Sequence, residues 1–477
     1  MKLKWLPVLL AICMFSCKKD DKLPGIILTK PHGPVTDSVA LNVSIDDSKP
    51  GYTVSPMFEG FSYETALLAQ NPEYLNSQNQ VFINLVKNLG RGVIRIGGNS
   101  SDQMNWAGNT TDTTPKNIVT TAQIDRLAAF SKATGWPVIF GLNLVNKDAA
   151  AAAQEAEYVS KKLGNNLLSL QSGNEPDVYG LGPRPKTYSY NDFRAEWYSY
   201  FKSVKKAAPQ VSFAGPDVTP FNNTWISDFS TQERTNINLI DGHYYATGPA
   251  SSPNIQYSDI LSDNKHLQEY LLTLNDVAEN TGKPYRISEC NSVYGQGKPG
   301  VSNVFASALW ALDFMWKVAA NNGQGVNFHG GNMHFVYSPI AHPGNQFIAQ
   351  PEYYAMLAFK YGAVGRTIIP ANMDNRGYNV SVHAVTSLHK SYSVTLINKE
   401  VKTDAIFTIS FNKTVKNISV ARLTSPAITS GDVTFAGSQV NADGTFNTAI
   451  TETYEVNNSN SIKVKIPAAS AAVVTVN

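Results

Sequence analysis

The chain is poor in cysteine: only Cys13, Cys17 and Cys290 occur in its 477 residues. If Cys13 leaves with an export signal and Cys17 carries a lipid, Cys290 stands alone and a disulfide is excluded. The same count excludes a metal centre ligated by several cysteines. The eight histidines show no HExxH-type spacing, and His329 and His334 are the closest pair near other polar residues. We therefore expect no metal and no cofactor.

Charge of one sign is also scarce. The formal net charge is +2, and no basic run follows the N-terminus. Nucleic acid is therefore not an expected partner. Hydrophobic residues make up 43% of the chain, with 22 Tyr and 21 Phe. This composition supports large cores in two or three domains, and it suits a protein that handles flat apolar faces such as sugar rings.

A long hydrophobic run is missing as well. The apolar stretch 5–15, preceded by Lys2 and Lys4, is too short to span a bilayer permanently and is typical of an export signal. Cys17 follows it in a context that resembles a bacterial lipobox, and the "KKDD" after it is similar to the surface-export signal of Bacteroidetes-type lipoproteins. We expect a signal peptide over 1–16, a lipid on Cys17 that anchors the protein to the outer membrane, and a tether over 17–37. An ordinary cleaved signal with an incidental cysteine is the alternative.

One sequence pattern repeats through the middle of the chain: an amphipathic helix, a glycine, then a short and continuously apolar strand. Such strands are typical of parallel sheets that are covered on both faces. Eight candidates lie between Met57 and His334, and they predict an α/β fold, a (β/α)8 barrel over 57–364. Their sequences are "MFEGFSYE", "GVIRIGGNSSD", "PVIFGLNL", "LLSLQSGNEPD", "VSFAGPDV", "NLIDGHYY", "PYRISECNS" and "GVNFHGGNMH".

The hydrophobic pattern of the sequence changes after Gly365. Short alternating runs such as "YNVSVHAV" and "YSVTLIN" follow one another, separated by Asn, Gly, Lys and Ser. This pattern predicts an antiparallel β-sandwich domain over 365–477. The early run "VALNVSID" alternates too, so residues 38–56 are expected to give an N-terminal strand to that domain.

Reactive residues of such barrels lie at the carboxyl ends of the strands. Two glutamates stand out there, because Glu175 ends the predicted fourth strand and Glu289 the seventh, on opposite walls of one mouth. Opposed carboxyl groups are what glycoside hydrolysis requires, and a carboxyl partly removed from water can serve as the proton donor. The strand ends in order carry Glu64, Asp102, Asn143, Asn174–Glu175, Asp217, His243–Tyr244–Tyr245, Glu289 and His329.

The motifs "SGNEPD", "SECNSVYGQG" and "RIGGNSSD", with a terminal β-domain, resemble glycoside hydrolase family 79, the β-glucuronidase and heparanase group of the retaining (β/α)8 glycosidases. The resemblance implies that Glu175 is the acid/base and Glu289 the nucleophile. It implies that Asn174 binds the sugar 2-hydroxyl and that Glu64 and Asp102 bind other ring hydroxyls. The alternatives are an ion-pair role for the two glutamates and capping roles for the other three.

A glucuronic acid also carries a carboxylate that needs donors. The resemblance places tyrosines and backbone N–H groups there, and Tyr245, Tyr294 and Tyr337 match in position. Gly295 and Gly297 would let backbone amides approach the ligand. We expect Tyr244 to pack inward, Cys290 to be a buried small residue, and the helix 302–321 to carry Trp310 and Trp316 as core residues.

The leading hypothesis is therefore an exo-acting, retaining β-glucuronidase that acts on a glucuronic acid-containing oligosaccharide or polysaccharide. Three alternatives remain open: a β-glycosidase for neutral sugars such as β-xylosides or β-glucosides, an endo-acting heparanase-like enzyme, and a glycan-binding lipoprotein without activity. An endo mode on sulfated chains would need a basic cleft, and the strand-end loops carry only Lys147, Arg184, Lys186 and Lys298.

Overall fold

The structure is a computed structural model. It describes residues 26–27, 37–111, 116–331, 334–387, 391–450 and 452–476. The predicted signal peptide, with Cys13 and Cys17, lies outside these ranges, as does nearly all of the tether, so the lipid anchor stays a prediction. Within these ranges no helix is both long and apolar enough to cross a membrane.

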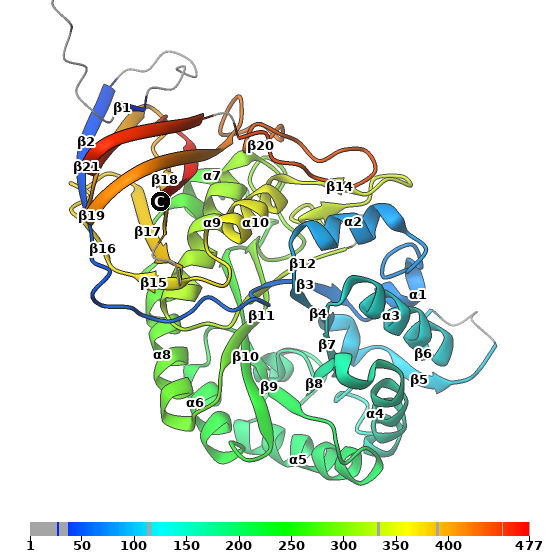
Figure 1. Ribbon diagram of the computed structural model, residues 1–477. Helices are drawn as coiled ribbons and strands as arrows, with labels where there is room; N and C mark the ends of the chain where they lie inside the picture. The colour runs from blue at the N-terminus through cyan, green and yellow to red at the C-terminus, as the bar shows by residue number, and fades with distance from the viewer. Residues whose placement is uncertain are drawn as a thin grey trace, which may run out of the picture.

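Eight parallel strands close into a barrel, which confirms the predicted (β/α)8 fold (Figure 1). Each strand pairs with the next along the chain, and the last pairs with the first through Phe328 and Phe61. In chain order they are β3 (Glu59–Glu64), β4 (Gly92–Gly97), β7 (Val138–Leu142), β8 (Leu167–Ser172), β9 (Phe213–Val218), β10 (Ile237–Thr247), β11 (Tyr285–Val293) and β12 (Val326–Gly330). All eight sequence candidates correspond to these strands.

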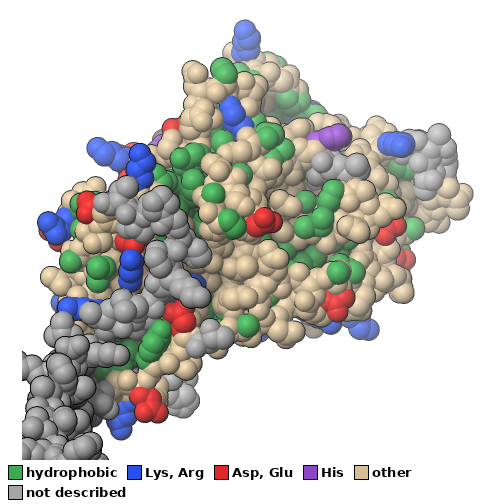
Figure 2. All heavy atoms as spheres, turned by 90° about the horizontal axis from the view of Figure 1, so that it is seen from above, with side chains coloured by type: hydrophobic (Ala, Val, Ile, Leu, Met, Phe, Trp, Pro, Cys, Tyr) green, Lys and Arg blue, Asp and Glu red, His purple; other side chains and the backbone are tan. Residues whose placement is uncertain are grey.

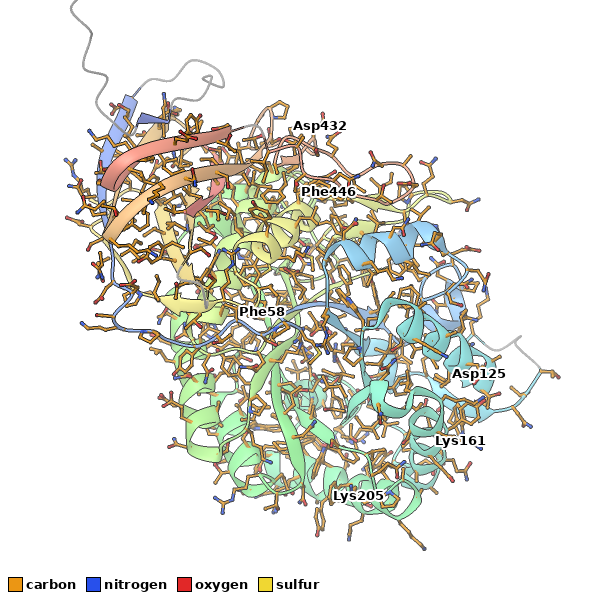
Figure 3. The ribbon with its side chains drawn as sticks, viewed as in Figure 1. Phe58, Asp125, Lys161, Lys205, Asp432 and Phe446 are labelled. Atoms are coloured by element: carbon orange, nitrogen blue, oxygen red, sulfur yellow. The ribbon has the colours of Figure 1, made fainter. Side chains whose placement is uncertain are left out.

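Helices follow the strands and cover the outside of the barrel. Their sequence signals are capping residues: Gly135 and Gly282 end α3 (Thr121–Thr134) and α8 (Lys265–Thr281) with φ of 74° and 68°, a conformation that glycine adopts without strain. Asp125, Lys161 and Lys205 lie on the outer helices of the barrel (Figure 3). The principal helices are α2 (Gln80–Asn88), α3 (Thr121–Thr134), α4 (Ala149–Leu163), α5 (Tyr190–Ala207), α6 (Asn223–Gln232), α8 (Lys265–Thr281), α9 (Phe305–Ala320) and α10 (Pro351–Gly362).

Shorter elements decorate the barrel. They are the helices α1 (Leu67–Gln70) and α7 (Tyr257–Leu261) and the paired strands β5 (Asn105–Gly108) with β6 (Ile118–Thr120) and β13 (Ile340–Ala341) with β14 (Ile348–Ala349). Helix α9 matches the predicted apolar helix, and Trp310 and Trp316 on it are 5% and 1% exposed, as core residues should be.

The C-terminal domain is one ten-stranded, mostly antiparallel sheet with its own hydrophobic core. The 22-residue strand β19 runs through it and pairs successively with several neighbours. The run before the barrel forms β2, which pairs in parallel with the first half of β19, on the edge opposite to β21 (Figure 1). The strands are β1 (Ile26–Ile27), β2 (Asp37–Ile45), β15 (Thr367–Ile369), β16 (Ala371–Met373), β17 (Val380–Thr386), β18 (Tyr392–Asn398), β19 (Thr403–Thr424), β20 (Thr434–Phe435), β21 (Glu452–Ile466) and β22 (Ser470–Val476).

The β-domain packs on the barrel through α9 and α10. Asp313 of α9 accepts a hydrogen bond from Lys399 at 2.8 Å, and both side chains are buried. Burial would raise the pKa of Asp313, but Lys399 and its other cationic neighbours lower it well below its ordinary value. Near this contact the ring of Trp316 stacks on His383 at 5.1 Å. At the entrance to β3, Phe58, labelled in Figure 3, packs against Phe359 of α10.

Candidate active site

A cavity of about 1070 Å³ opens where the carboxyl ends of the barrel strands meet. Its size suits a small ligand or a few sugar units. Among the predicted site residues, those that line it are Glu64, Glu175, Tyr245, Glu289, Tyr294, Gly295 and Tyr337. Asn174, Asp102 and Gly297 lie behind its wall.

Glu175 stands three residues beyond β8, at the mouth of the cavity. Its φ is 48°, an uncommon left-handed conformation for a residue with a side chain, and its N–H donates to the Asp217 carbonyl at 2.9 Å. Pro176 follows and starts a 3₁₀ helix, Pro176–Leu181. The side chain of Glu175 is 22% exposed, and its Oε1 lies 2.9 Å from His243 Nδ1. The backbone therefore turns this carboxyl group out of the strand and into the cavity.

Glu289 faces Glu175 across the cavity from strand β11. The strand does not end there as predicted, because its pairing with β10 continues as far as Val293. Glu289 Oε2 accepts from Arg95 Nη1 at 2.6 Å, and Oε1 accepts from the Tyr245 hydroxyl at 2.8 Å. Burial alone would raise the pKa of Glu289, but the cationic groups of His329, His243 and Arg95, with the Tyr245 hydrogen bond, hold it well below its ordinary value.

The two carboxyl groups lie close enough to act on one bond. One oxygen of Glu175, one oxygen of Glu289 and a nitrogen of His243 all lie within 4.8 Å of one another. This triangle has the size of a metal site. However, the pKa of His243 is raised well above its ordinary value, and a protonated imidazole offers no lone pair to a metal. The group therefore fits a proton-transfer site better than a metal site.

His243 joins Glu175 to a second carboxylate. Its Nδ1 lies 2.9 Å from Glu175 Oε1, and its Nε2 lies 2.9 Å from Asp217 Oδ1. Burial would lower the pKa of His243, but the negative charges of Asp217 and Glu289 and the two hydrogen bonds outweigh it. The protonated ring can donate from both nitrogens, which fixes the orientation of the Glu175 carboxyl group.

Arg95 of β4 is the centre of a buried polar network under the cavity. Its guanidinium donates to Asp217 Oδ2 at 2.6 Å and to Gln171 Oε1 at 2.9 Å, besides the bond to Glu289. Gln171 in turn donates to Asp217 and to Asp241. Burial would lower the pKa of Arg95, but Asp217 and Glu289 raise it, so the cation is permanent.

Sequence reasoning missed Arg95 and gave no role to His243 or Asp217, although the latter two stood among the strand ends. The signal was present. An arginine inside "GVIRIG" has to be paired if the strand is buried, by the reasoning that draws attention to Glu175 at the end of "LLSLQS". Arg95 lies in the middle of its strand, whereas reactive residues of such barrels are expected at the carboxyl ends of the strands.

Asp102 takes a bracing position instead of lining the cavity. Its Oδ2 accepts from the Tyr179 hydroxyl at 2.5 Å and the Asn174 N–H at 3.0 Å, and Oδ1 accepts from the Leu144 N–H. Burial raises the pKa of Asp102 to about 6 against the opposing effect of these hydrogen bonds. The position is the capping alternative that the sequence left open, since the neighbours of this carboxylate are protein donors.

Asn174 is 4% exposed and is engaged on both sides of its amide. Its Oδ1 accepts from Arg95 Nη2 at 2.8 Å, and its Nδ2 donates to Asn99 at 3.1 Å. One proton of the amide nitrogen remains for a ligand. Asn174 is thus anchored beside Glu175, and its predicted contact with a sugar hydroxyl stays a prediction.

Glu64 reaches the cavity from the end of β3. Its Oε2 accepts from the N–H and the hydroxyl of Ser100, and its Oε1 lies 3.5 Å from His329 Nε2. Burial would raise the pKa of Glu64, but His329 and Ser100 lower it below its ordinary value. A fixed carboxylate at this place can accept hydrogen bonds from hydroxyl groups of a ligand.

The three tyrosines that the sequence predicts as donors, Tyr245, Tyr294 and Tyr337, cluster in space, but their hydroxyl groups do not all have the same role. The ring of Tyr245 lies 6.4 Å from Tyr294 and 6.1 Å from Tyr337, while its hydroxyl points to Glu289. Gly295 lines the cavity, whereas Gly297 packs behind Tyr337, where a Cβ would lie 2.7 Å from the Tyr337 nitrogen. Tyr245 is therefore a partner of Glu289. Tyr294 is exposed to the cavity, whereas Tyr337 lines it while 3% exposed and also hydrogen-bonds to Tyr245.

Tyr244, the neighbour of Tyr245 on β10, points into the hydrophobic core instead of the cavity. Tyr244 is 1% exposed and stacks on Phe314 at 5.3 Å. Cys290 is fully buried beside Glu289, and burial raises the pKa of its thiol well above the ordinary value. Both residues thus belong to the core, as the sequence predicts.

Comparisons with known proteins indicate a glycoside hydrolase. Residues 377–473 match the family model described as the glycosyl hydrolase family 79 C-terminal beta domain. A β-glucuronidase of Aspergillus niger is 26% identical over 446 residues, which covers 84% of this chain and 77% of that enzyme. A heparanase of Mus musculus is 25% identical over 300 residues and is matched over about half its length, 52%, and over 57% of this chain.

Solved structures share the fold. A 4-O-α-L-rhamnosyl-β-D-glucuronidase from Fusarium oxysporum 12S superposes with a TM-score of 0.76 at 19% identity, over 92% of this chain and 100% of that one. An arabinofuranosidase from Xanthomonas axonopodis pv. citri reaches a TM-score of 0.67 at 15% identity, over 92% of this chain and 100% of that one. At these identities the likeness concerns the architecture alone: a barrel joined to a β-domain.

Proposed function

Since the chain belongs to glycoside hydrolase family 79, we propose that this hydrolase is a retaining, exo-acting β-glucuronidase that releases terminal β-linked glucuronic acid from glycans. One observation carries the proposal. Glu175 and Glu289 face each other across the cavity, and Glu289 is held ionised by Arg95 and Tyr245.

The two glutamates have different surroundings, and these suit different roles. An ionised Glu289 can attack the anomeric carbon and form a covalent glycosyl-enzyme, while Glu175 protonates the departing glycosidic oxygen. Water then attacks the intermediate as Glu175 takes its proton, and Glu289 is released. A double displacement of this kind requires a carboxyl separation of roughly 5–5.5 Å. The proposal is supported by the short distance between the two groups, since one oxygen of Glu175 lies within 4.8 Å of one oxygen of Glu289.

The part of the cavity wall that Tyr294 and Tyr337 form suits a uronic acid. The side chains of Tyr294 and Tyr337 line it together with Gly295, and Tyr294 is 42% exposed. Phenolic hydroxyls and a backbone N–H can donate hydrogen bonds to the sugar carboxylate without an arginine. The named activity of the Aspergillus relative, β-glucuronidase, supports the same substrate class.

Exo action is favoured over a heparanase-like endo mode by charge. Among the described residues that line the cavity, none is Lys or Arg. Figure 2 shows one face of the molecule, on which basic side chains are scattered, mostly toward its outline. A long sulfated chain needs a row of cations to bind, whereas a single terminal sugar does not.

We also propose that Cys17 is lipidated and that the enzyme is anchored to the outer membrane, facing the periplasm or the exterior. The proposal rests on the motif that follows the export signal. Radiolabelled palmitate should be incorporated into the wild-type chain and should be absent from Cys17→Ala, which should also leave the membrane fraction. Equal labelling and fractionation of the two proteins would contradict the anchor.

The first test of function is hydrolysis of 4-nitrophenyl β-D-glucuronide beside the β-glucoside and the β-xyloside. Wild type should cleave the glucuronide, Glu289→Gln should lose this activity, and NMR should detect the β-anomer as the first product. Glu157→Gln, on the exposed side of α4, is the matched control. Preference for a neutral glycoside would contradict the uronic acid assignment. Detection of the α-anomer as the first product would contradict retention.

A further inference from the structure

We propose that Leu181, Phe221 and His266 form a platform that binds the leaving group and selects uncharged aglycones with an apolar face, such as a neutral sugar ring. The inference rests on the proposed β-glucuronidase function and adds a substrate preference to it. Glu175 and Glu289 define where the bond breaks, and the platform concerns what lies on the departing side.

The platform residues are exposed in an unusual way. Leu181 is 89% exposed and Phe221 is 75% exposed, yet both line the cavity. Leaving a large apolar side chain in water forgoes about 1.5–3 kcal/mol of burial free energy, and exposed apolar surface within a concave site is typical of ligand contact. The ring of His266 lies 5.2 Å from that of Phe221 at an interplanar angle of 32°, so the two rings pack in a tilted arrangement.

The platform is fixed relative to the proton donor. Leu181 ends the 3₁₀ helix that starts directly after Glu175. Asp177 in that helix accepts hydrogen bonds from the hydroxyl of Thr219 at 2.5 Å and from Asn222 Nδ2 at 2.8 Å. These two contacts tie the loop that carries Phe221 to the helix that carries Leu181. The two apolar side chains are therefore held by the same short segment that positions the acid.

Their side of the cavity is the departing side. Glu175 protonates the glycosidic oxygen, and this oxygen leaves with the aglycone, so the aglycone must extend past Glu175. Leu181 and Phe221 follow β8 and β9, whereas Tyr294 and Tyr337, the proposed donors to the glucuronic acid, follow β11 and β12. A ring that leaves over Leu181 and Phe221 can cover their apolar surface with its C–H face.

The charge of the cavity decides which rings fit. No described residue that lines it is Lys or Arg, while Glu64, Glu175 and Glu289 all carry carboxyl groups. A sulfated or carboxylated aglycone would find no Lys or Arg side chain of the described lining to pair with, only the imidazoles of His266 and His329, and would approach these acids. A neutral sugar carries no charge to be repelled; it can pack on the apolar platform and hydrogen-bond to amides of the cavity lining such as those of Gln103 and Asn264.

The test compares three substrates that share one glycone: β-glucuronyl fluoride, a glucuronyl β-linked neutral hexose, and the same disaccharide with sulfate on the hexose. The fluoride has no aglycone ring, so its hydrolysis reports on Glu289 and the glycone pocket alone. The measured quantity is the ratio of kcat/KM for the neutral disaccharide to kcat/KM for the fluoride. The variants are Phe221→Ala and Phe221→Tyr, with Leu272→Ala, an exposed leucine on α8 outside the cavity, as the control.

We expect Phe221→Ala to lower this ratio about tenfold, since an aromatic contact is worth about 1.5 kcal/mol. Phe221→Tyr should restore the ratio, and Leu272→Ala should match the wild type. Wild type should prefer the neutral disaccharide to the sulfated one. An unchanged ratio in Phe221→Ala, or a preference for the sulfated substrate, overturns the platform while fluoride hydrolysis persists. Failure of wild type to hydrolyse the fluoride would instead overturn the proposed function, and the platform with it.

Discussion

The guanidinium of Arg95 lies 2.6 Å from Glu289 and 2.6 Å from Asp217, and it is completely buried. One cation thus compensates two carboxylates in the interior of the barrel. This relationship links stability and chemistry, because the group that keeps Glu289 ionised is also the group that makes the buried network tolerable.

Replacing Arg95 by methionine should therefore lower the stability of the protein and also raise the pKa of Glu289. Two buried carboxylates lose a cationic partner and keep only their other contacts, with His243 for Asp217 and Tyr245 for Glu289, so we expect the free energy of unfolding to fall by about 3–5 kcal/mol. The pKa of Glu289 should rise, which moves the acidic limb of the kcat/KM profile to higher pH. Denaturant unfolding and a pH profile measure the two effects. Arg91→Met, an exposed arginine four residues away, is the control, and a variant as stable as the wild type would contradict the pairing.

Tyr245→Phe removes a single hydroxyl from the Glu289 carboxylate. A hydrogen bond to a charged acceptor contributes about 1.5–3 kcal/mol, so kcat/KM should fall about 10- to 100-fold. The pKa of Glu289 should rise, because this hydrogen bond lowers it. The neighbouring variant Tyr244→Phe is a matched control, since the Tyr244 hydroxyl is buried without a hydrogen-bond partner in the described part of the chain. Equal losses in the two variants would show that packing, and not the bond to Glu289, matters.

His243→Gln should act through Glu175. The histidine holds the acid by a 2.9 Å contact and touches no leaving group itself, so it is a positioning residue. We expect hydrolysis of an unactivated disaccharide to fall about 100-fold, and hydrolysis of the nitrophenyl glucuronide far less, because nitrophenolate leaves without a proton. Steady-state kinetics on both substrates measure the difference. A loss of the same size on both would mean that His243 supports the fold alone.

Sequence reasoning reached the barrel and the two glutamates for a physical reason. Continuous apolar strands, helix periodicity and C-capping glycines such as Gly135 are local signals that tertiary contacts did not override. Glu175 was visible because a carboxyl group after a buried strand is anomalous. Glu289 was found by the same rule, although β11 continues beyond it because β10 is long enough to pair with it.

The rest of the site depends on which way side chains turn, and a one-dimensional pattern does not contain that. Asp102 and Asn174 follow their strands as expected, yet their polar atoms meet each other and Arg95 instead of the cavity. Tyr245 follows its strand as predicted, but its hydroxyl reaches across to Glu289 on the next strand. Such pairings across the barrel depend on the register between strands, which the residues of a single strand do not specify.

Glu155 tests the link between burial and pH at a place remote from the cavity. It lies on α4, is 6% exposed, and has no ion-pair partner in the part of the chain that the structure describes. Burial raises the pKa of Glu155 from 4.5 to about 8. The folded state therefore binds a proton that the unfolded state has released, and stability falls as the pH rises from 4.5 to about 8. Glu155→Gln should gain stability relative to the wild type between pH 6 and pH 9, measured by denaturant unfolding at both values. Glu157→Gln, on the exposed side of the same helix, should show no such gain, and a parallel pH dependence of wild type and Glu155→Gln would contradict the shifted pKa.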